Sequence, residues 1–262
     1  MDFARAAQFL TDTAARAGAA IMEHYHRGAA VMLKDDASPV TLADKDSEAI
    51  ILKSLLELAP EIPVVSEEDA DKPEAVGSRY FLVDPLDGTK EFIKKRSDFT
   101  VNIALIEQGQ PSFGLVYAPA RSLLAVTVAP GEAIEAELSP SVAGVDLAKL
   151  PQKRLTVRTA DPNGLTALVS LSHLDPETEA FLAKLKIAKR SGAGSSVKFL
   201  EIARGEADVY PRFGPTMEWD TAAGQAVLEA SGGKVVTVCG DPLRYGKTAS
   251  GLRNPSFIAW GR

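Results

Sequence analysis

The stretch Asp84-Pro85-Leu86-Asp87-Gly88-Thr89 follows the apolar run Tyr80-Phe81-Leu82-Val83, and it decides how this chain is interpreted. Two carboxylates three residues apart in a tight turn repel each other unless a positive charge lies between them. The hexapeptide contains neither Lys nor Arg. Mg²⁺ prefers oxygen ligands and keeps positions open for water and phosphate. The stretch therefore indicates a metal-and-phosphate site at the end of a buried strand.

The other residues of the hexapeptide suit the same purpose. Pro85 restricts φ and so sets the direction of the Leu86 carbonyl group. Gly88 permits a sharp or left-handed turn. Thr89 supplies a hydroxyl group at the expected start of a helix, where free backbone N–H groups favour an anion. Turn chemistry alone does not explain a second acid and a Gly-Thr pair after a strand.

Three further segments with acidic residues each have an ordinary structural explanation when taken alone. Glu67-Glu68 could be exposed loop acids, Asp220 could be an N-cap, and Thr41 with Asp44 resembles a capping box. Once the hexapeptide is accepted as a cation site, these acids become candidate partners in it.

The first part of the chain predicts two helices and then a mostly antiparallel sheet. Apolar residues at helical spacing predict a helix over 2–26, stopped by Gly28, and a second over about 41–59, before Pro60. Alternation and turn residues predict further elements, namely strands at 62–66, 79–84, 100–106, 112–117 and 123–128, with a short helix after Thr89.

Residues 138–153 resemble a connector, and beyond them strands and helices alternate. Such alternation predicts an α/β half with ligands near strand ends. The expected strands are 154–158, 167–172, 186–190, 207–210, 234–239 and 256–260, and the expected helices are 175–185, 195–204 and 221–231.

Composition limits the function classes. The 262 residues, 45% of them hydrophobic, can bury a full core in one or two domains. A net charge of −6 argues against nonspecific nucleic-acid binding. The single cysteine, Cys239, fits a reducing cytoplasm and is expected in a buried strand. We expect neither a signal peptide nor a membrane span.

A second cluster is basic and rich in Gly and Ser, Ser191-Gly192-Ala193-Gly194-Ser195-Ser196-Val197-Lys198. Gly-x-Gly before a helix could hold a phosphate, although it lacks the third glycine of a dinucleotide fingerprint. Arg212 and His173 are further candidate phosphate contacts. Each alone is more often an ion-pair member or a hydrogen-bonded histidine.

Three of these segments together resemble the signatures of the lithium-sensitive, Mg²⁺-dependent inositol monophosphatase superfamily. They are Glu67-Glu68, the hexapeptide 84–89, and Trp219-Asp220-Thr221-Ala222-Ala223-Gly224. Four more segments resemble the CysQ type within it, the 3′(2′),5′-bisphosphate nucleotidases. They are 90–93, Phe99-Thr100-Val101-Asn102-Ile103-Ala104-Leu105-Ile106, 194–199 and 210–216.

The resemblance implies roles for the acidic residues. Glu67, Asp84 and the Leu86 carbonyl would hold one Mg²⁺, and Asp84, Asp87 and Asp220 would hold a second, with two or three ions in all. Thr89 would orient the attacking water, Asp44 would accept the Thr89 hydroxyl proton, and Glu67 is the third expected catalytic residue.

The same resemblance implies a substrate site. The Gly88 and Thr89 amides would contact the reacting phosphate, beside the metal-binding residues Glu67, Leu86, Asp87 and Asp220. The nucleotide and its second phosphate would contact His173, Ser195, Lys198 and Arg212. Leu171 stands where the CysQ type usually has Arg, which would remove one positive contact.

The expected fold is therefore α+β, a layered α-β-α-β-α sandwich. It would have a metal-binding half over 1–145 and an α/β half over 146–262 that contributes Asp220. The expected reaction is hydrolysis of the 3′-phosphate of 3′-phosphoadenosine 5′-phosphate, or of its 5′-phosphosulfate, by a metal-activated water in the cytoplasm. Peripheral contact with the inner membrane and the oligomeric state are left open. The alternatives are an inositol monophosphatase, a fructose-1,6-bisphosphatase, or a noncatalytic nucleotide-sensing protein.

Overall fold

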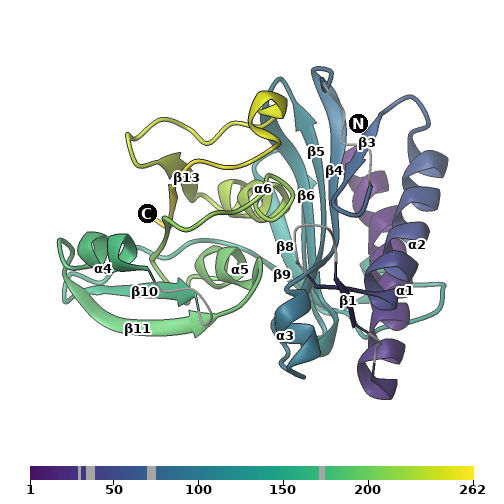
Figure 1. The fold of residues 1–262 in the computed structure, drawn as a ribbon, viewed down its shortest axis with the longest axis horizontal. Coiled ribbons are helices and arrows are strands. Elements are labelled where there is room, and N and C mark those ends of the chain that lie inside the picture. The colour runs from purple at the N-terminus through teal and green to yellow at the C-terminus, as the bar shows by residue number, and fades with distance from the viewer. Residues whose placement is uncertain (29–30, 34–38, 70–74, 171–174) are drawn as a thin grey trace.

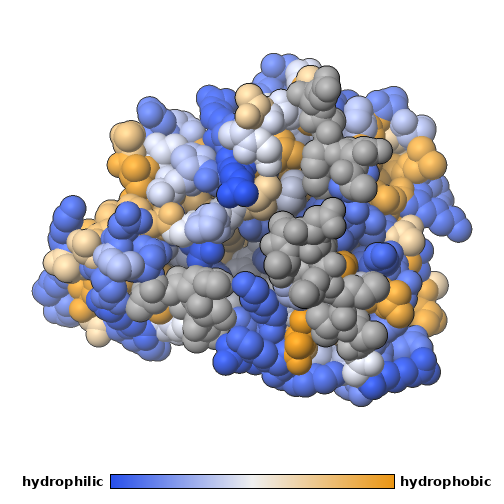
Figure 2. All heavy atoms as spheres, viewed as in Figure 1, coloured by the Kyte–Doolittle hydropathy of each residue, from blue (hydrophilic) through white to orange (hydrophobic). Residues whose placement is uncertain are grey.

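A computed structural model describes residues 1–28, 31–33, 39–69, 75–170 and 175–262. His173 and Leu171, for which the sequence predicts a phosphate contact and a missing one, lie outside these residues. Among the described residues, no helix is long and apolar enough to cross a bilayer. On the face drawn in Figure 2, hydrophobic residues lie in separate patches among hydrophilic ones.

The two predicted N-terminal helices are confirmed. α1 (Phe3–Arg27) begins after Asp2, whose carboxylate accepts a hydrogen bond from Arg5 N at 3.1 Å, and ends at Gly28 with φ 84°. α2 (Leu42–Leu58) begins with the predicted capping box, in which Thr41 and Asp44 bond each other's backbone groups. Both helices pack on the same side of a large sheet, α1 against β6 and β7 and α2 against β4.

That sheet has seven strands in the order β3-β4-β5-β6-β7-β8-β9, and only the β3–β4 pair is parallel. The strands are β3 (Val64–Ser66), β4 (Arg79–Asp87), β5 (Thr100–Glu107), β6 (Gln110–Ala118), β7 (Leu123–Ala129), β8 (Glu132–Glu137) and β9 (Gln152–Arg154). A separate small pair joins β1 (Val31–Leu33) to β2 (Pro39–Thr41).

Alternating residues of the large sheet enter two different cores. On β4, Phe81 and Val83 join the cluster that packs on α1 and α2, whereas Tyr80 and Leu82 join the cluster on the opposite face. This period of two is why a strand buried on both faces reads as a continuous apolar run. Asp84 continues the second set, so its carboxylate is on the face turned toward the other half of the chain.

The second half forms a five-stranded sheet in the order β11-β10-β12-β14-β13. Its strands are β10 (Leu165–Ser170), β11 (Ile187–Ala193), β12 (Val209–Arg212), β13 (Lys234–Thr237) and β14 (Phe257–Trp260). β10 is parallel to β11 and β12, as alternation predicts, while β14 runs antiparallel to its neighbours.

Helices of the second half lie on both sides of this sheet. α5 (Val197–Ala203) and α6 (Ala222–Ala230) lie between the two sheets, and α4 (Pro176–Leu182) packs on β12. Figure 1 shows the resulting layers, from α1 and α2 through the large sheet, α5 and α6, and the smaller sheet to α4. The predicted α-β-α-β-α sandwich is confirmed. The division at residue 145 stays a prediction, and β9 of the large sheet lies beyond it.

Several predicted elements are wrong in detail. The sequence predicts a strand over 154–158, whereas β9 covers 152–154. The strand ends there because the next two backbone N–H groups that form hydrogen bonds have partners in different parts of the fold: Leu155 N donates to Ala133 O, and Val157 N donates to Ser231 O. β8 lies in a segment for which no strand was predicted. The hexapeptide is not one tight turn, since β4 continues to Asp87 with a register shift after Asp84.

Cys239 is not buried in a strand. β13 ends at Thr237, and a turn closed by Gly240 N and Thr237 O follows, which leaves the cysteine exposed. The apolar run Val235-Val236-Thr237-Val238 predicted a longer strand. The turn at Gly240, whose φ is 92°, ends it earlier.

A glycine on β6 sets how closely α6 approaches the large sheet. A Cβ atom at Gly114 would lie 2.7 Å from Ala226 Cβ, and it would also meet the Ala223 backbone. We expect Gly114→Ala to lower the free energy of unfolding by about 1–3 kcal/mol, as overpacking does. Urea denaturation measures this, with Gly77→Ala as control, because the nearest atom to a Cβ there is 4.0 Å away. Equal stability of the two variants would contradict the close approach.

Candidate active site

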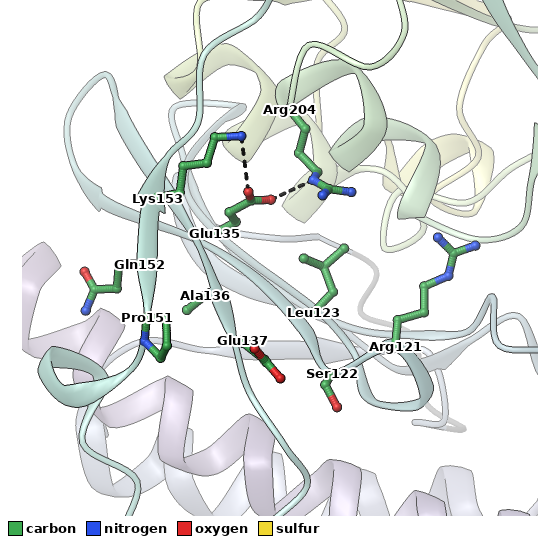
Figure 3. Close-up of a pocket in the computed structure, with 10 residues that line it drawn as sticks. All are labelled: Arg121, Ser122, Leu123, Glu135, Ala136, Glu137, Pro151, Gln152, Lys153 and Arg204. Atoms are coloured by element: carbon green, nitrogen blue, oxygen red, sulfur yellow. Dashed lines mark ion pairs between the residues drawn. The ribbon is translucent and has the colours of Figure 1, made fainter.

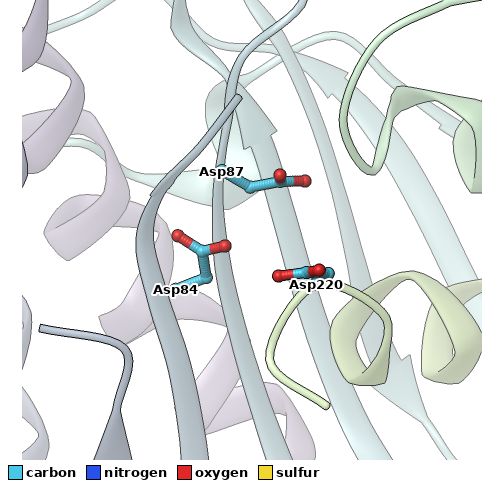
Figure 4. Close-up of side chains that lie close together, drawn as sticks. All are labelled: Asp84, Asp87 and Asp220. Atoms are coloured by element: carbon cyan, nitrogen blue, oxygen red, sulfur yellow. The ribbon is translucent and has the colours of Figure 1, made fainter. Parts of the chain in front are cut away.

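Three carboxylates meet where β4 ends and α6 begins. Oxygen atoms of Asp84, Asp87 and Asp220, one from each residue, lie within 4.8 Å of one another. Figure 4 shows Asp84 and Asp87 coming from one strand and Asp220 from the segment before a helix. The sequence predicted all three as metal ligands, and the structure brings them together. We call these three residues the acid cluster.

Asp84 is the buried member of the acid cluster, with 1% of its surface exposed. Its Oδ1 accepts a hydrogen bond from Leu86 N at 3.0 Å, at the point where the β4–β5 register shifts. Burial, and then the negative charges of Glu67, Asp87 and Asp220, raise the pKa of Asp84 well above its ordinary value. A divalent cation would relieve this repulsion, so the residues present fit the metal that the sequence indicates.

The ordinary structural explanation of Asp220, an N-cap of α6, is wrong. The helix begins at Ala222 after Thr221, and the Asp220 Oδ2 atom accepts from Met217 N at 2.9 Å. Burial and then the Asp87 carboxylate raise the pKa of Asp220 well above its ordinary value. Its carboxylate is therefore turned toward the acid cluster and not toward its own helix.

Glu67 directly follows β3, where its backbone N–H donates to Val83 O at 3.0 Å. This parallel pairing places Glu67 beside Asp84, and the negative charge of Glu67 contributes to the raised pKa of Asp84. Glu68 lies close enough to Asp44 to contribute to the raised pKa of that residue. Both acids of the Glu67-Glu68 pair are therefore near the hexapeptide.

Thr89 and Asp44 are in contact, as predicted. Thr89 Oγ1 lies 3.2 Å from Asp44 Oδ1 and 3.3 Å from Leu86 O. Asp44 Oδ2 is held by the N–H and the hydroxyl of Thr41, each at 2.8 Å. Burial raises the pKa of Asp44, while the bonds from Thr41 oppose that rise. The capping box thus fixes an acceptor for the Thr89 hydroxyl proton.

Gly88 connects the strand to α3 (Thr89–Ile93) in a left-handed conformation, with φ 93°. A Cβ atom there would lie 2.9 Å from Asp98 O, so only glycine fits without strain. This conformation places Thr89 beside Asp44.

The Gly/Ser-rich segment of the second half reaches the acid cluster directly. Asp87 Oδ2 accepts from Ser195 Oγ at 2.5 Å and from Ser196 N at 2.9 Å. Ser196 Oγ donates to Asp220 O at 2.8 Å. Sequence reasoning named Ser195 and missed Ser196, whose only signal was its place next to Ser195 before a helix.

Lys198 and Arg212 differ in their surroundings. Lys198 is buried and donates through Nζ to Ser195 O at 2.9 Å and Ala193 O at 3.2 Å, and burial lowers its pKa to about 8. Arg212 ends β12 and donates from one terminal nitrogen to Pro215 O at 3.0 Å. Lys198 therefore supports the loop that carries Ser195, while Arg212 lies at the C-terminal end of β12, the central strand of the smaller sheet.

A separate cavity of about 330 Å³ lies between β7, β8, β9 and the end of α5. Figure 3 shows that Glu135 in this cavity is paired with Lys153, at 3.6 Å, and with Arg204, at 2.6 Å. Its lining combines the cations Arg121, Lys153 and Arg204 with the carboxylates Glu135 and Glu137, so it offers a ligand less net charge than the acid cluster does.

Comparison with known proteins agrees with this geometry. The chain is 45% identical to the 3′(2′),5′-bisphosphate nucleotidase CysQ of Shigella flexneri over 93% of this chain and 95% of that protein. It is 46% identical to the protein of that name from Salmonella typhimurium, with the same coverage. The crystal structure of CysQ from Bacteroides thetaiotaomicron, described as a bacterial member of the inositol monophosphatase family, superposes with a TM-score of 0.83. That match is 37% identical and covers 99% of this chain and 98% of the other.

The sequence also matches the inositol monophosphatase family as a whole, over residues 3–258. The match includes every member of the acid cluster, the Thr89–Asp44 pair and the Gly/Ser-rich segment. The chain belongs to the inositol monophosphatase family.

Proposed function

We propose that this protein is a 3′(2′),5′-bisphosphate nucleotidase that removes the 3′-phosphate of 3′-phosphoadenosine 5′-phosphate, giving AMP and phosphate. The 5′-phosphosulfate analogue would be a second substrate. The observation that carries the proposal is the acid cluster, which joins residues of both halves beside a threonine–aspartate pair. Its support from comparison is the extent of identity to the CysQ proteins.

The proposed metal ligands are Glu67, Asp84, the Leu86 carbonyl, Asp87 and Asp220. Carboxylate and carbonyl oxygens are the atoms that Mg²⁺ binds in proteins. Two or three bound Mg²⁺ ions would lower the pKa of water and neutralise charge on the phosphate during in-line displacement. The acid cluster supports metal binding in general, and the number of ions is part of the proposal.

The other residues of the site would orient the reactants. Because Asp44 accepts the Thr89 hydroxyl proton, the Thr89 oxygen has a lone pair available for a proton of the attacking water. Glu67, beside Asp84, would accept from the same water. The Gly88 and Thr89 amides would donate to the reacting phosphate.

The second phosphate would bind on the side of the smaller sheet. Arg212 supplies a guanidinium group, which suits phosphate recognition. Lys198 and Ser195 would contribute charge and shape through the loop 193–196, and His173 stays a predicted contact outside the described residues. This separation of an acidic cluster from a basic side favours a bisphosphate over the monophosphate of an inositol phosphatase.

The deciding experiment is phosphate release with and without Mg²⁺. The substrates are 3′-phosphoadenosine 5′-phosphate, inositol 1-phosphate and fructose 1,6-bisphosphate. We expect Mg²⁺-dependent turnover with the first substrate preferred. Preference for either sugar phosphate would support the related phosphatases, and binding of the nucleotide without turnover would support a nucleotide sensor. A cytoplasmic location and the absence of nucleic-acid binding stay predictions.

Lithium should inhibit this activity at concentrations where sodium and potassium do not. A small monovalent ion can occupy a Mg²⁺ position among carboxylates without supplying the second positive charge. Initial rates in LiCl, NaCl and KCl at equal ionic strength measure the effect. Equal rates in the three salts would count against the proposed cation site.

A further inference from the structure

Two polar side chains of β5 lie directly across from the acid cluster. In the β4–β5 pairing Thr100 is opposite Asp87 and Asn102 is opposite Asp84. Both side chains are buried, Thr100 with 0% and Asn102 with 1% of its surface exposed. They belong to the segment 99–106, which resembles the CysQ type and has no role in the proposed reaction. Side chains directly opposite in an antiparallel pair are close enough to interact.

These residues form a continuous chain of contacts to Asp87. The side-chain oxygen of Asn102 lies 3.0 Å from Thr100 Oγ1, and Thr100 Oγ1 lies 2.5 Å from Ser195 Oγ. Ser195 Oγ in turn lies 2.5 Å from Asp87 Oδ2. This chain of side-chain contacts starts in the large sheet, crosses to the second half at Ser195 and returns to the large sheet at Asp87.

The number of hydroxyl protons decides which group is the donor in each of these hydrogen bonds. An ionised Asp87 can only accept, so Ser195 must donate its single hydroxyl proton to it. Thr100 must then donate its own proton to Ser195. The remaining contact can be a hydrogen bond only if the Asn102 amide nitrogen, and not its oxygen, is turned toward Thr100.

A buried polar atom supports the same orientation of Asn102. With the amide oxygen toward Thr100, the Nδ2 group has no hydrogen-bond partner among the described residues. Such a buried donor is costly. Exchanging the two amide atoms, which have nearly the same shape, gives Nδ2 an acceptor at Thr100 Oγ1. It leaves an unpaired carbonyl oxygen in place of the unpaired N–H group, and buried carbonyl oxygens are more often left unpaired in native structures.

We propose that Thr100 and Asn102 are positioning residues that hold the Ser195 hydroxyl group as a donor to Asp87. Asp87 Oδ2 then receives two hydrogen bonds, from Ser195 Oγ and Ser196 N, which leaves Oδ1 as the oxygen available to a cation. The chain of bonds also fixes the Gly/Ser-rich loop against the acid cluster. This inference rests on the proposed function only in taking Asp87 as a metal ligand.

The test compares two buried strand threonines. Thr100→Val removes the hydroxyl and keeps the β-branched shape, and Thr100→Ser keeps the hydroxyl. Thr127→Val is the matched control, because Thr127 is 1% exposed on β7 and, among the described residues, its hydroxyl bonds the backbone of Gly114. Mn²⁺ binding to the metal-free protein, followed by the electron paramagnetic resonance of free Mn²⁺, is the readout.

We expect Thr100→Val to weaken Mn²⁺ binding about 10-fold, the lower part of the range for groups that orient a metal ligand. Thr100→Ser should restore the affinity, and Thr127→Val should leave it unchanged even if both valine variants melt at lower temperature. Equal Mn²⁺ affinities of Thr100→Val and Thr127→Val would overturn the proposal. If Thr100→Val does not fold, Asn102→Ala serves instead, with an expected loss of roughly 3- to 10-fold for one hydrogen bond.

A double-mutant cycle with Ser195→Ala tests whether Thr100 acts through Ser195. In the Ser195→Ala background, Thr100→Val should weaken Mn²⁺ binding no further, because the two residues share one chain of bonds. Independent, additive losses would overturn the direct coupling. The result is separate from substrate identity, since a wild-type protein that binds Mn²⁺ but does not hydrolyse the bisphosphate would contradict the proposed function alone.

Discussion

Asp87→Asn is expected to lower kcat/KM more than about 100-fold while the protein remains folded. The amide preserves the shape of the side chain and can still accept the bonds from Ser195 Oγ and Ser196 N. It loses the charge that a second cation requires. Residues that only orient a ligand already change affinity or activity 10- to 100-fold, so loss of a proposed ligand should exceed about 100-fold.

Thermal unfolding separates this explanation from simple destabilisation. Without metal, Asp87→Asn should be at least as stable as the wild type, because one of the mutually repelling charges near Asp84 and Asp220 is removed. With Mg²⁺, the wild type should gain stability by ligand binding and the variant should gain less. Asp241→Asn, at an exposed position after β13, is the control and should match the wild type in both conditions. Near-full activity of Asp87→Asn at saturating Mg²⁺ would disprove its role as a ligand.

Arg212→Ala should reduce kcat/KM far more for a bisphosphate than for a monophosphate. The Nε atom of Arg212 is buried without a hydrogen-bond partner among the described residues, and one terminal nitrogen bonds Pro215 O at 3.0 Å. A charge-assisted hydrogen bond contributes about 1.5–3 kcal/mol, which corresponds to a roughly 10- to 150-fold fall in kcat/KM. Because the resemblance to the CysQ type implies that Leu171 replaces a further cation, we expect the upper part of that range.

The measurement is kcat/KM for 3′-phosphoadenosine 5′-phosphate and for inositol 1-phosphate in the same variants. Arg190→Ala is the matched control, since Arg190 lies on β11 of the same sheet and pairs with Glu179 at 2.8 Å on the surface. Mn²⁺ affinity should be unchanged in both arginine variants. An equal loss on both substrates would mean that Arg212 serves the fold or the reacting phosphate, and the bisphosphate assignment would lose its main support.

Lys198 is less suitable than Arg212 for such a comparison. Its ammonium group donates to the carbonyls of Ala193 and Ser195 and lies 5.0 Å from the centre of the Tyr210 ring. Removing it would free the loop that carries Ser195 and Ser196, so the acid cluster would change together with the substrate site. The sequence predicts both cations as phosphate contacts, and the burial of Lys198 distinguishes it as an internal support of the loop.

Local spacing determined the parts of this protein that lie within one strand or one turn. The hexapeptide 84–89 predicts a cation site because its two acids, its glycine and its threonine are close along the chain. The capping box of Thr41 and Asp44 is local for the same reason. The α+β class follows from hydrophobic periodicity, which a single segment displays by itself.

Only the tertiary structure decided which distant segments meet at that site. The local pattern around Asp220 indicates an ordinary N-cap, and only the family resemblance predicts it as a metal ligand. The packing of α6 on the large sheet is what turns its carboxylate toward Asp87. The sequence alone indicates only that Thr100 is a buried strand residue. The β4–β5 register places it opposite Asp87 and within hydrogen-bond distance of Ser195. Sequence spacing carries no information on strand register or on the approach of the two sheets, because both depend on side-chain packing between segments far apart in the chain.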